Sequence, residues 1–138
     1  NQPIPTTAGQ LAQTVFASLA LQYAKTADTL VECSNLPMAA IHIVGGGSQN
    51  EHLCQLTADI SNRQVIAGPV EATAMGNAMV QAIALGQQEQ LTDTISARAL
   101  IENSNLGLKK YDPSKDADPN TIAAVRDRYE KLTMEDMR

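Results

Sequence analysis

The stretch IHIVGGGSQNEHLCQL, residues 41–56, joins a β-branched run to a helix start through three consecutive glycines. The run at 39–44 predicts a buried strand, because β-branched residues favour extended chain. Ser48 stands three residues before Glu51, a capping-box spacing that predicts a helix beginning near Gln49. A glycine-rich turn between strand and helix exposes main-chain N–H groups and the positive end of the helix dipole. The stretch therefore predicts either a ligand site or a purely structural tight turn.

The glycine run excludes two well-known nucleotide motifs. Gly45, Gly46 and Gly47 do not match the G-x-G-x-x-G spacing of dinucleotide-binding folds, and no G-K-[ST] follows them as in a P-loop. A further glycine, Gly76, lies inside a predicted helix, where it costs about 1 kcal/mol relative to alanine. We expect it to permit close approach by a neighbouring helix or, alternatively, by a ligand.

Helix and strand patterns alternate along most of the chain. In order they are a helical period at 7–30, a strand at 39–44, a helix from about 49, a strand at 63–68 and a helix at 70–85. This order predicts an α/β fold with its strands covered on both sides. Two short strands make a small, incomplete sheet, so we expect its neighbours to lie in other parts of a longer polypeptide.

The first two helices show apolar stripes that we predict to be their buried faces. In the first helix, the stripe is Leu11, Val15, Phe16, Leu19, Ala20, Tyr23 and Leu30. In the second, it is Leu53, Leu56, Thr57 and Ile60. Thr6 or Thr7 can cap the first helix, and Asn35 with Pro37 should end it.

The last third of the chain is less regular. Residues 91–105 are predicted to form a helix capped by Thr92, and residues 106–117 an extended link. Asp118 and Pro119 are typical of the N-cap and first position of a further helix. Its inward face is predicted to be Ile122, Val125, Tyr129 and Leu132, with Asp127 and Lys131 paired on the other face.

The composition favours a globular domain and argues against several partners. The 138 residues are 43% hydrophobic and carry a net charge of −5. Lys109 and Lys110 are the only adjacent basic pair, which is not typical of nucleic-acid binding. No apolar run approaches the ~20 residues that span a bilayer. We therefore expect a cytoplasmic protein with neither a nucleic-acid nor a membrane partner.

The cysteines and histidines give no metal-binding spacing. Cys33 and Cys54 lack a CxxC or His-paired arrangement, so buried reduced thiols are the simpler interpretation and a disulfide between them is the alternative. His42 lies on a predicted strand and His52 on a helix flank, with no third ligand at metal spacing. We predict no metal site in this chain.

Four motifs occur in order between residues 18 and 86. They are a Ser-Leu-Ala helix, a Gly-Gly-Gly-x-x-Asn turn, an Ala-Asp pair before the second strand, and Glu-Ala-Thr-Ala-x-Gly at the start of the next helix. Through them the chain resembles the C-terminal region of the FGGY family of carbohydrate kinases. The stretch IAGPVEATAMGN, residues 66–77, further resembles the rhamnulokinase subfamily.

The resemblance implies an actin-like ATPase fold, also called ribonuclease-H-like, that binds ATP between two domains. Residues 1–138 would form a single helix-rich domain fragment, the later part of the C-terminal kinase domain. The resemblance implies that Gly46 and Gly47 pass close to the ribose and phosphates, and that Asn50 faces the adenine edge. Gly45 would mainly shape the turn, and Gln49 is a further candidate.

The family reaction would be phosphoryl transfer from ATP, with Mg²⁺, to L-rhamnulose, giving L-rhamnulose 1-phosphate. The catalytic aspartate would lie upstream of Asn1, which is not a start methionine. We therefore assign no catalytic residue, interpret Asp59 as structural and expect this chain alone to be inactive. Its partners would be ATP and a ketose, with self-association through the open sheet and exposed surface. Alternatives are a kinase for another ketose, such as fuculose or xylulose, or a non-catalytic module that binds a nucleotide or a partner.

Overall fold

The computed structural model describes residues 4–86, 92–104 and 107–135, so Asn1 and the ends of the predicted helix at 91–105 lie outside the described residues. In chain order the elements are α1 (Ala8–Ser34), β1 (Ala40–Ile43), the 3-10 turn η1 (Gly45–Gln49), α2 (Glu51–Ser61), β2 (Gln64–Ala67), α3 (Ala72–Leu85), α4 (Thr94–Asn103), β3 (Lys109–Tyr111) and α5 (Pro119–Glu135). The predicted alternation of helices and strands is confirmed.

A three-stranded sheet lies at the centre, in the order β1-β2-β3. β1 and β2 run parallel, with Ile41 opposite Val65, and β3 joins β2 antiparallel, with Tyr111 opposite Val65. β3 falls in the segment that was predicted to be an extended link. Its sequence, Lys-Lys-Tyr, is too short and too polar to carry a strand pattern.

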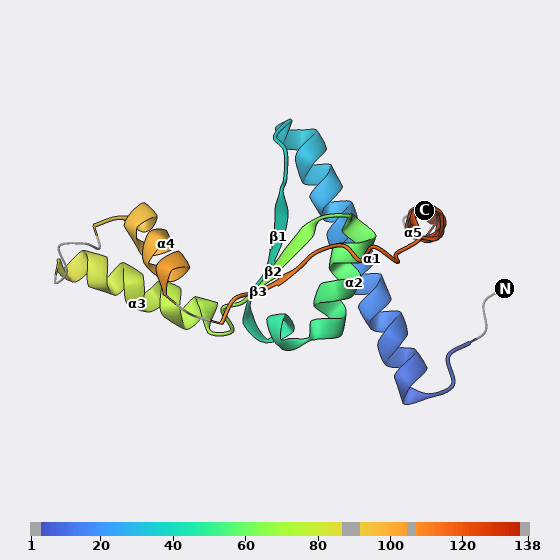
Figure 1. The fold of residues 1–138 in the computed structure, drawn as a ribbon, viewed down its shortest axis with the longest axis horizontal. Helices are drawn as coiled ribbons and strands as arrows, with labels where there is room; N and C mark the ends of the chain where they lie inside the picture. The colour runs from blue at the N-terminus through green and yellow to red at the C-terminus, as the bar shows by residue number, and fades with distance from the viewer. Residues whose placement is uncertain (1–3, 87–91, 105–106, 136–138) are drawn as a thin grey trace.

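Helix α2 covers one face of the sheet and α1 packs on α2, whereas α3 and α4 extend away from the sheet (Figure 1). Ile41 and Ile43 of β1 pack in the core on the α2 side. The intervening residue His42 is exposed, as expected for a strand whose side chains alternate between faces. The prediction that both faces are covered is therefore wrong for the described residues.

Helix α2 divides the core into two clusters. Against α1, the buried residues are Ala20, Leu21, Ala24, Leu53 and Ile60. Against the sheet, they are Ile43, Cys54, Ala58, Val65 and Ala67. The predicted buried stripe of α2 is confirmed, because Leu53, Thr57 and Ile60 are buried and Leu56 is partly buried.

The buried face of α1 differs from its predicted apolar stripe. Leu11, Val15, Leu19 and Leu30 are exposed. Three members of the stripe do face the core, because Ala20 is buried and Phe16 and Tyr23 are partly buried, but the other buried positions are Leu21, Ala24 and Ala27. Small side chains on this face let the two helix backbones approach closely. The aliphatic residues Leu11, Val15, Leu19 and Leu30 of the stripe are therefore left outside this contact.

Most helix ends follow the predicted signals. Thr7 caps α1 and forms a capping box with Gln10, while Asn35 ends the helix in the left-handed conformation. Gly86 ends α3 in the same way.

Two start positions differ from prediction. Asp93 rather than Thr92 caps α4, and α3 begins at Ala72 rather than at residue 70, with Glu71 as its N-cap residue. At α5, Asp118 accepts from the backbone N–H groups of Asn120 and Thr121, as predicted.

A polar clasp holds α5 to the rest of the fold. The Asp28 carboxylate on α1 pairs with Arg63, 2.8 Å away, and with Arg126 of α5. Arg126 also donates to the Ile60 carbonyl over 3.2 Å.

The predicted inward face of α5 is only partly correct, because Ile122 and Tyr129 are partly buried but Val125 and Leu132 are exposed. The predicted Asp127–Lys131 pair is confirmed at 2.6 Å.

Helix α3 is unusual in having neither a charged nor a buried residue. Its Gly76 is exposed, and a Cβ at that position would meet nothing within 4 Å. The expected close neighbour of Gly76 is therefore absent from the described residues. No described helix is both long enough and apolar enough to cross a membrane.

Both cysteines are free thiols. Cys54 is buried, as predicted, whereas Cys33 is exposed at the end of α1. The prediction of a buried thiol is therefore wrong for Cys33, because the last turn of α1 extends past the helices and strands that form the core.

We expect Asp28→Asn to lower the free energy of unfolding by about 1–3 kcal/mol, because it removes a charge shared by two arginines. The matched control is Asp127→Asn, which breaks an exposed pair worth only about 0.3–0.5 kcal/mol. Urea denaturation followed by circular dichroism measures both. Equal losses in the two variants would mean that the clasp contributes no more than a surface ion pair.

Candidate functional site

The glycine turn lies just beyond the carboxyl ends of the parallel strands β1 and β2. Two main-chain hydrogen bonds join the segments that leave these strands. Gly45 N donates to Pro69 O over 3.1 Å, and Gly68 N donates to Ile43 O over 2.8 Å. In open α/β sheets, ligands bind outside the carboxyl ends of the strands. The turn is thus held at the edge of the sheet where a ligand is expected.

Only one of the three glycines is required by the conformation of the turn. Gly45 has a φ of +73°, which other residues rarely adopt. Gly46 is exposed, and a Cβ there would meet nothing within 4 Å. A Cβ on Gly47 would make an ordinary contact with Ile43 Cγ2 at 3.6 Å. A purely structural tight turn accounts for Gly45 but not for the bare main chain at Gly46 and Gly47.

Asn50 is the N-cap of α2. Its Oδ1 accepts from Leu53 N over 3.0 Å, and its own N–H donates to Gly47 O over 3.2 Å. The predicted capping box of Ser48 and Glu51 is therefore wrong, since Ser48 is buried and its hydroxyl donates to Gly45 O over 2.6 Å. With its oxygen engaged in the cap, Asn50 keeps both Nδ2 donors free for a ligand.

A hollow of about 290 Å³, called here the turn hollow, lies beside the glycine turn. Its lining comes from the turn, from the segment after β2 and from the start of β3, and consists of Ser48, Gln49, Ala67, Gly68, Pro69, Val70, Gly107 and Lys109. The structure thus brings the candidate Gln49 to the wall of this hollow. Gly68–Val70 and Lys109 were not predicted for the site. The basic pair at 109–110 in an acidic chain was the one available signal for Lys109.

Lys109 is held by the first residue of α2. Its Nζ lies 2.5 Å from Glu51 Oε1, and both side chains are well exposed. The hydrogen bond from Lys109, followed by its charge, lowers the pKa of Glu51, and the same hydrogen bond raises the pKa of Lys109. Both groups are therefore charged at neutral pH. Because water screens such an exposed pair, it is easily exchanged for another partner.

Two buried polar groups lie in the sheet-side core near this pair. Burial raises the pKa of the Cys54 thiol, which disfavours the nucleophilic thiolate. The Tyr111 hydroxyl is buried without a hydrogen-bond partner among the described residues, and burial raises its pKa. Neither group is prepared to act as a nucleophile or base, so we assign no catalytic role to either.

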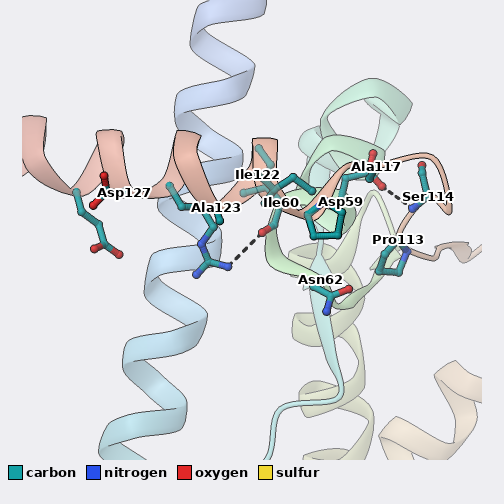
Figure 2. A pocket seen from close by; sticks show the side chains of 12 residues that line it. Asp59, Ile60, Asn62, Pro113, Ser114, Ala117, Ile122, Ala123 and Asp127 are labelled. Atoms are coloured by element: carbon teal, nitrogen blue, oxygen red, sulfur yellow. Dashed lines mark hydrogen bonds between the residues drawn. The ribbon is translucent and has the colours of Figure 1, made fainter.

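A larger hollow, of about 510 Å³, lies elsewhere, between the end of α2, the loop at 113–117 and α5 (Figure 2). Asp59 lines it, and its Oδ1 accepts from Ser114 N over 2.7 Å and from Gln55 Nε2 over 2.9 Å. The bond from Ser114 fastens the loop to α2, and the bond from Gln55 lies within α2. The interpretation of Asp59 as a structural residue therefore agrees with its contacts.

The histidines take part in no described metal cluster. His42 is exposed on β1, and His52 Nε2 lies 2.8 Å from Gln13 Oε1 with its ring edge-on to Phe16. Within residues 4–86, 92–104 and 107–135, no group of three or more His, Cys, Asp or Glu side chains is placed to hold a metal ion. We therefore assign no metal ligand to the described part of the chain.

Comparisons with known proteins agree on one family. The family model for the C-terminal domain of the FGGY family of carbohydrate kinases matches residues 1–85. A rhamnulokinase from Bacteroides thetaiotaomicron is 43% identical over 113 residues, which are 82% of this chain and 22% of that protein. A rhamnulokinase from Bacillus subtilis is 43% identical over 122 residues, which are 88% of this chain and 24% of that protein. The chain thus spans less than a quarter of the length of these relatives.

A solved structure shows the same fold. The crystal structure of xylulose kinase from Rhodospirillum rubrum superposes with a TM-score of 0.68 and 20% sequence identity. The match covers 98% of this chain and 26% of the kinase chain. At this identity, the likeness concerns the fold alone.

We expect Asn50→Ala to lower the free energy of unfolding by about 0.5–2 kcal/mol, because α2 loses its N-cap. Asn50→Ser is the matched variant, since serine keeps a capping oxygen and should restore most of that stability. Thermal and urea unfolding of the three proteins would measure the difference. A serine variant as unstable as the alanine variant would show that the cap is not the stabilising contact.

Proposed function

The chain belongs to the FGGY family of carbohydrate kinases, and on this premise we propose that the protein carrying it phosphorylates L-rhamnulose with ATP to give L-rhamnulose 1-phosphate. The choice of sugar follows the names of the two rhamnulokinase relatives. Because the chain spans 22–24% of their length, the proposal concerns a longer protein, of which this chain would supply the adenosine side of the ATP site.

The observation that carries this proposal is the bare main chain of the glycine turn at the carboxyl ends of β1 and β2. Gly46 is exposed with open space around its Cα, so a ribose or phosphate can approach the backbone directly. The Asn50 amide, fixed by its cap bond to Leu53, offers N–H donors to the adenine edge. Gly47 continues the same open surface, and Gly45 provides the bend.

Phosphoryl transfer depends on positioning the phosphates and neutralising their charge. The open glycine turn fits a nucleotide. When bound, ATP would supply the transferable phosphoryl group, and Mg²⁺ would neutralise charge on its phosphates. In our proposal this chain orients the adenosine, whereas the metal ligands, the sugar pocket and the catalytic carboxylate belong to residues outside the described part of the chain.

The proposal extends to the architecture and the location of the protein. Residues 1–138 would form a single unit, the later part of the C-terminal domain of an actin-like ATPase fold. The superposition on a xylulose kinase supports this at the level of the fold. A kinase that consumes ATP and a free ketose would work in the cytoplasm, where ATP is available.

We also propose that the isolated chain self-associates. Among the described residues, β1 pairs only with β2, so its other edge carries unpaired main-chain groups. Helix α3 adds an apolar surface without a buried residue. Sedimentation of the 138-residue chain should therefore show species heavier than a monomer that increase with concentration. A single monomeric species at high concentration would contradict this.

The kinase proposal predicts ATP-dependent phosphorylation of L-rhamnulose by a protein of the relatives' length that carries this chain, and none by residues 1–138 alone. A coupled assay of ADP release measures this, with L-fuculose and xylulose as competing substrates. Preference for another ketose would change the proposed substrate but not the reaction. Turnover by the isolated chain would contradict the division of roles.

Within the same longer protein, we expect Gly46→Val to weaken ATP binding by about tenfold or more, equivalent to ~1.4 kcal/mol, because the side chain occupies the space of the nucleotide. Gly9→Val is the matched control, since Gly9 is also without neighbours within 4 Å but belongs to α1 rather than to the turn. Isothermal titration calorimetry measures the affinity. Unchanged ATP binding by the Gly46 variant would place the nucleotide elsewhere.

A further inference from the structure

We propose that Lys109 contacts the phosphate chain of the bound nucleotide, and that Glu51 holds this lysine in position when no nucleotide is present. The inference rests on the proposed ATP site at the glycine turn and adds a binding residue from β3. Three observations support it: the position of β3, the charges that line the turn hollow and the exchangeable pairing of Lys109.

The antiparallel direction of β3 places its first residue at the ligand edge of the sheet. Lys109 is opposite Ala67, the last residue of β2, in the strand register. It therefore lies level with the carboxyl ends of the parallel strands, where the glycine turn begins. Both Lys109 and Gln49 line the turn hollow, which makes β3 a third wall of the site.

The charge of the turn hollow favours an anion. Among the described residues that line it, Lys109 is the one charged residue, and none carries a carboxylate. Elsewhere the chain is acidic, with a net charge of −5. A nucleotide phosphate that enters this hollow would therefore meet the Lys109 ammonium group, which is paired with Glu51 outside the lining, and uncharged walls formed by Gly68, Pro69 and Val70.

Glu51 holds Lys109 beside the site through an ion pair that a bound phosphate can replace. Glu51 opens α2 directly after Asn50, so its contact with Lys109 keeps the ammonium group beside the proposed adenosine surface. Both side chains are more than 60% exposed, so their mutual attraction is weak. The more highly charged phosphates can therefore displace Glu51, because lysine is a flexible point charge.

The test compares Lys109→Met with Lys110→Met in the longer protein that carries this chain. Lys110 is the adjacent residue of β3, and strand alternation points it to the opposite face of the sheet. Calorimetric titration with ATP and with adenosine separates phosphate contacts from base and ribose contacts. We expect Lys109→Met to weaken ATP binding about tenfold while leaving adenosine binding unchanged, and Lys110→Met to change neither.

A double-mutant cycle adds a measurement that a merely structural lysine would not affect. If Glu51 competes with phosphate for Lys109, Glu51→Gln should tighten ATP binding, and this gain should shrink in the Lys109→Met background. Equal gains in both backgrounds would show that Glu51 acts on the nucleotide independently of Lys109. Unfolding curves of each variant confirm that the compared proteins are folded.

The outcomes separate this inference from the kinase proposal. Failure of the unsubstituted protein to bind ATP would overturn the ATP site, and the role of Lys109 with it. Normal ATP binding by Lys109→Met would overturn the role of Lys109 alone. Equal losses for ATP and adenosine would also overturn it, because the lysine would then contact the nucleoside rather than the phosphates.

Discussion

The position of α2 depends on its packing on two sides. Leu53 and Ile60 are buried against α1, while Cys54 and Ala58 are buried against the sheet. A helix held from both sides cannot rotate or shift without disrupting one of the clusters. Its first turn, and with it the N-cap Asn50, is therefore set relative to the strand ends. This packing and the two main-chain hydrogen bonds to the segment after β2 together fix the position of the glycine turn.

The elements of the fold could largely be predicted from the sequence, because they depend on local signals. Helix caps such as Thr7 and Asn35, the β-branched run at 39–44 and the glycine turn act over a few residues. Which face of α1 is buried could not be predicted in the same way. The stripe was right for Ala20 and Tyr23, but α2 packs against the neighbouring alanines rather than against Leu11 or Leu30, and that choice depends on the partner helix.

The candidate site shows the same division between local and long-range information. The turn and Asn50 belong to one continuous stretch, so they could be singled out from sequence. Lys109 reaches the site from a three-residue strand more than fifty positions later, and a strand that short gives no reliable pattern. The local prediction also assigned the cap to Ser48 rather than Asn50. A spacing rule cannot anticipate that the glycines will form a 3-10 turn with Ser48 and Gln49, which moves the start of the helix to Glu51.

The uncharged helix α3 has a consequence for the energetics of assembly. At 14 residues with none buried, it depends on its own hydrogen bonds, and isolated helices of this length are marginal in water. Its backbone amides should therefore exchange with solvent through local opening, at a lower free energy than those of α2. Any surface that docks on α3 must also order it, and the free energy of that ordering is subtracted from the affinity of the contact.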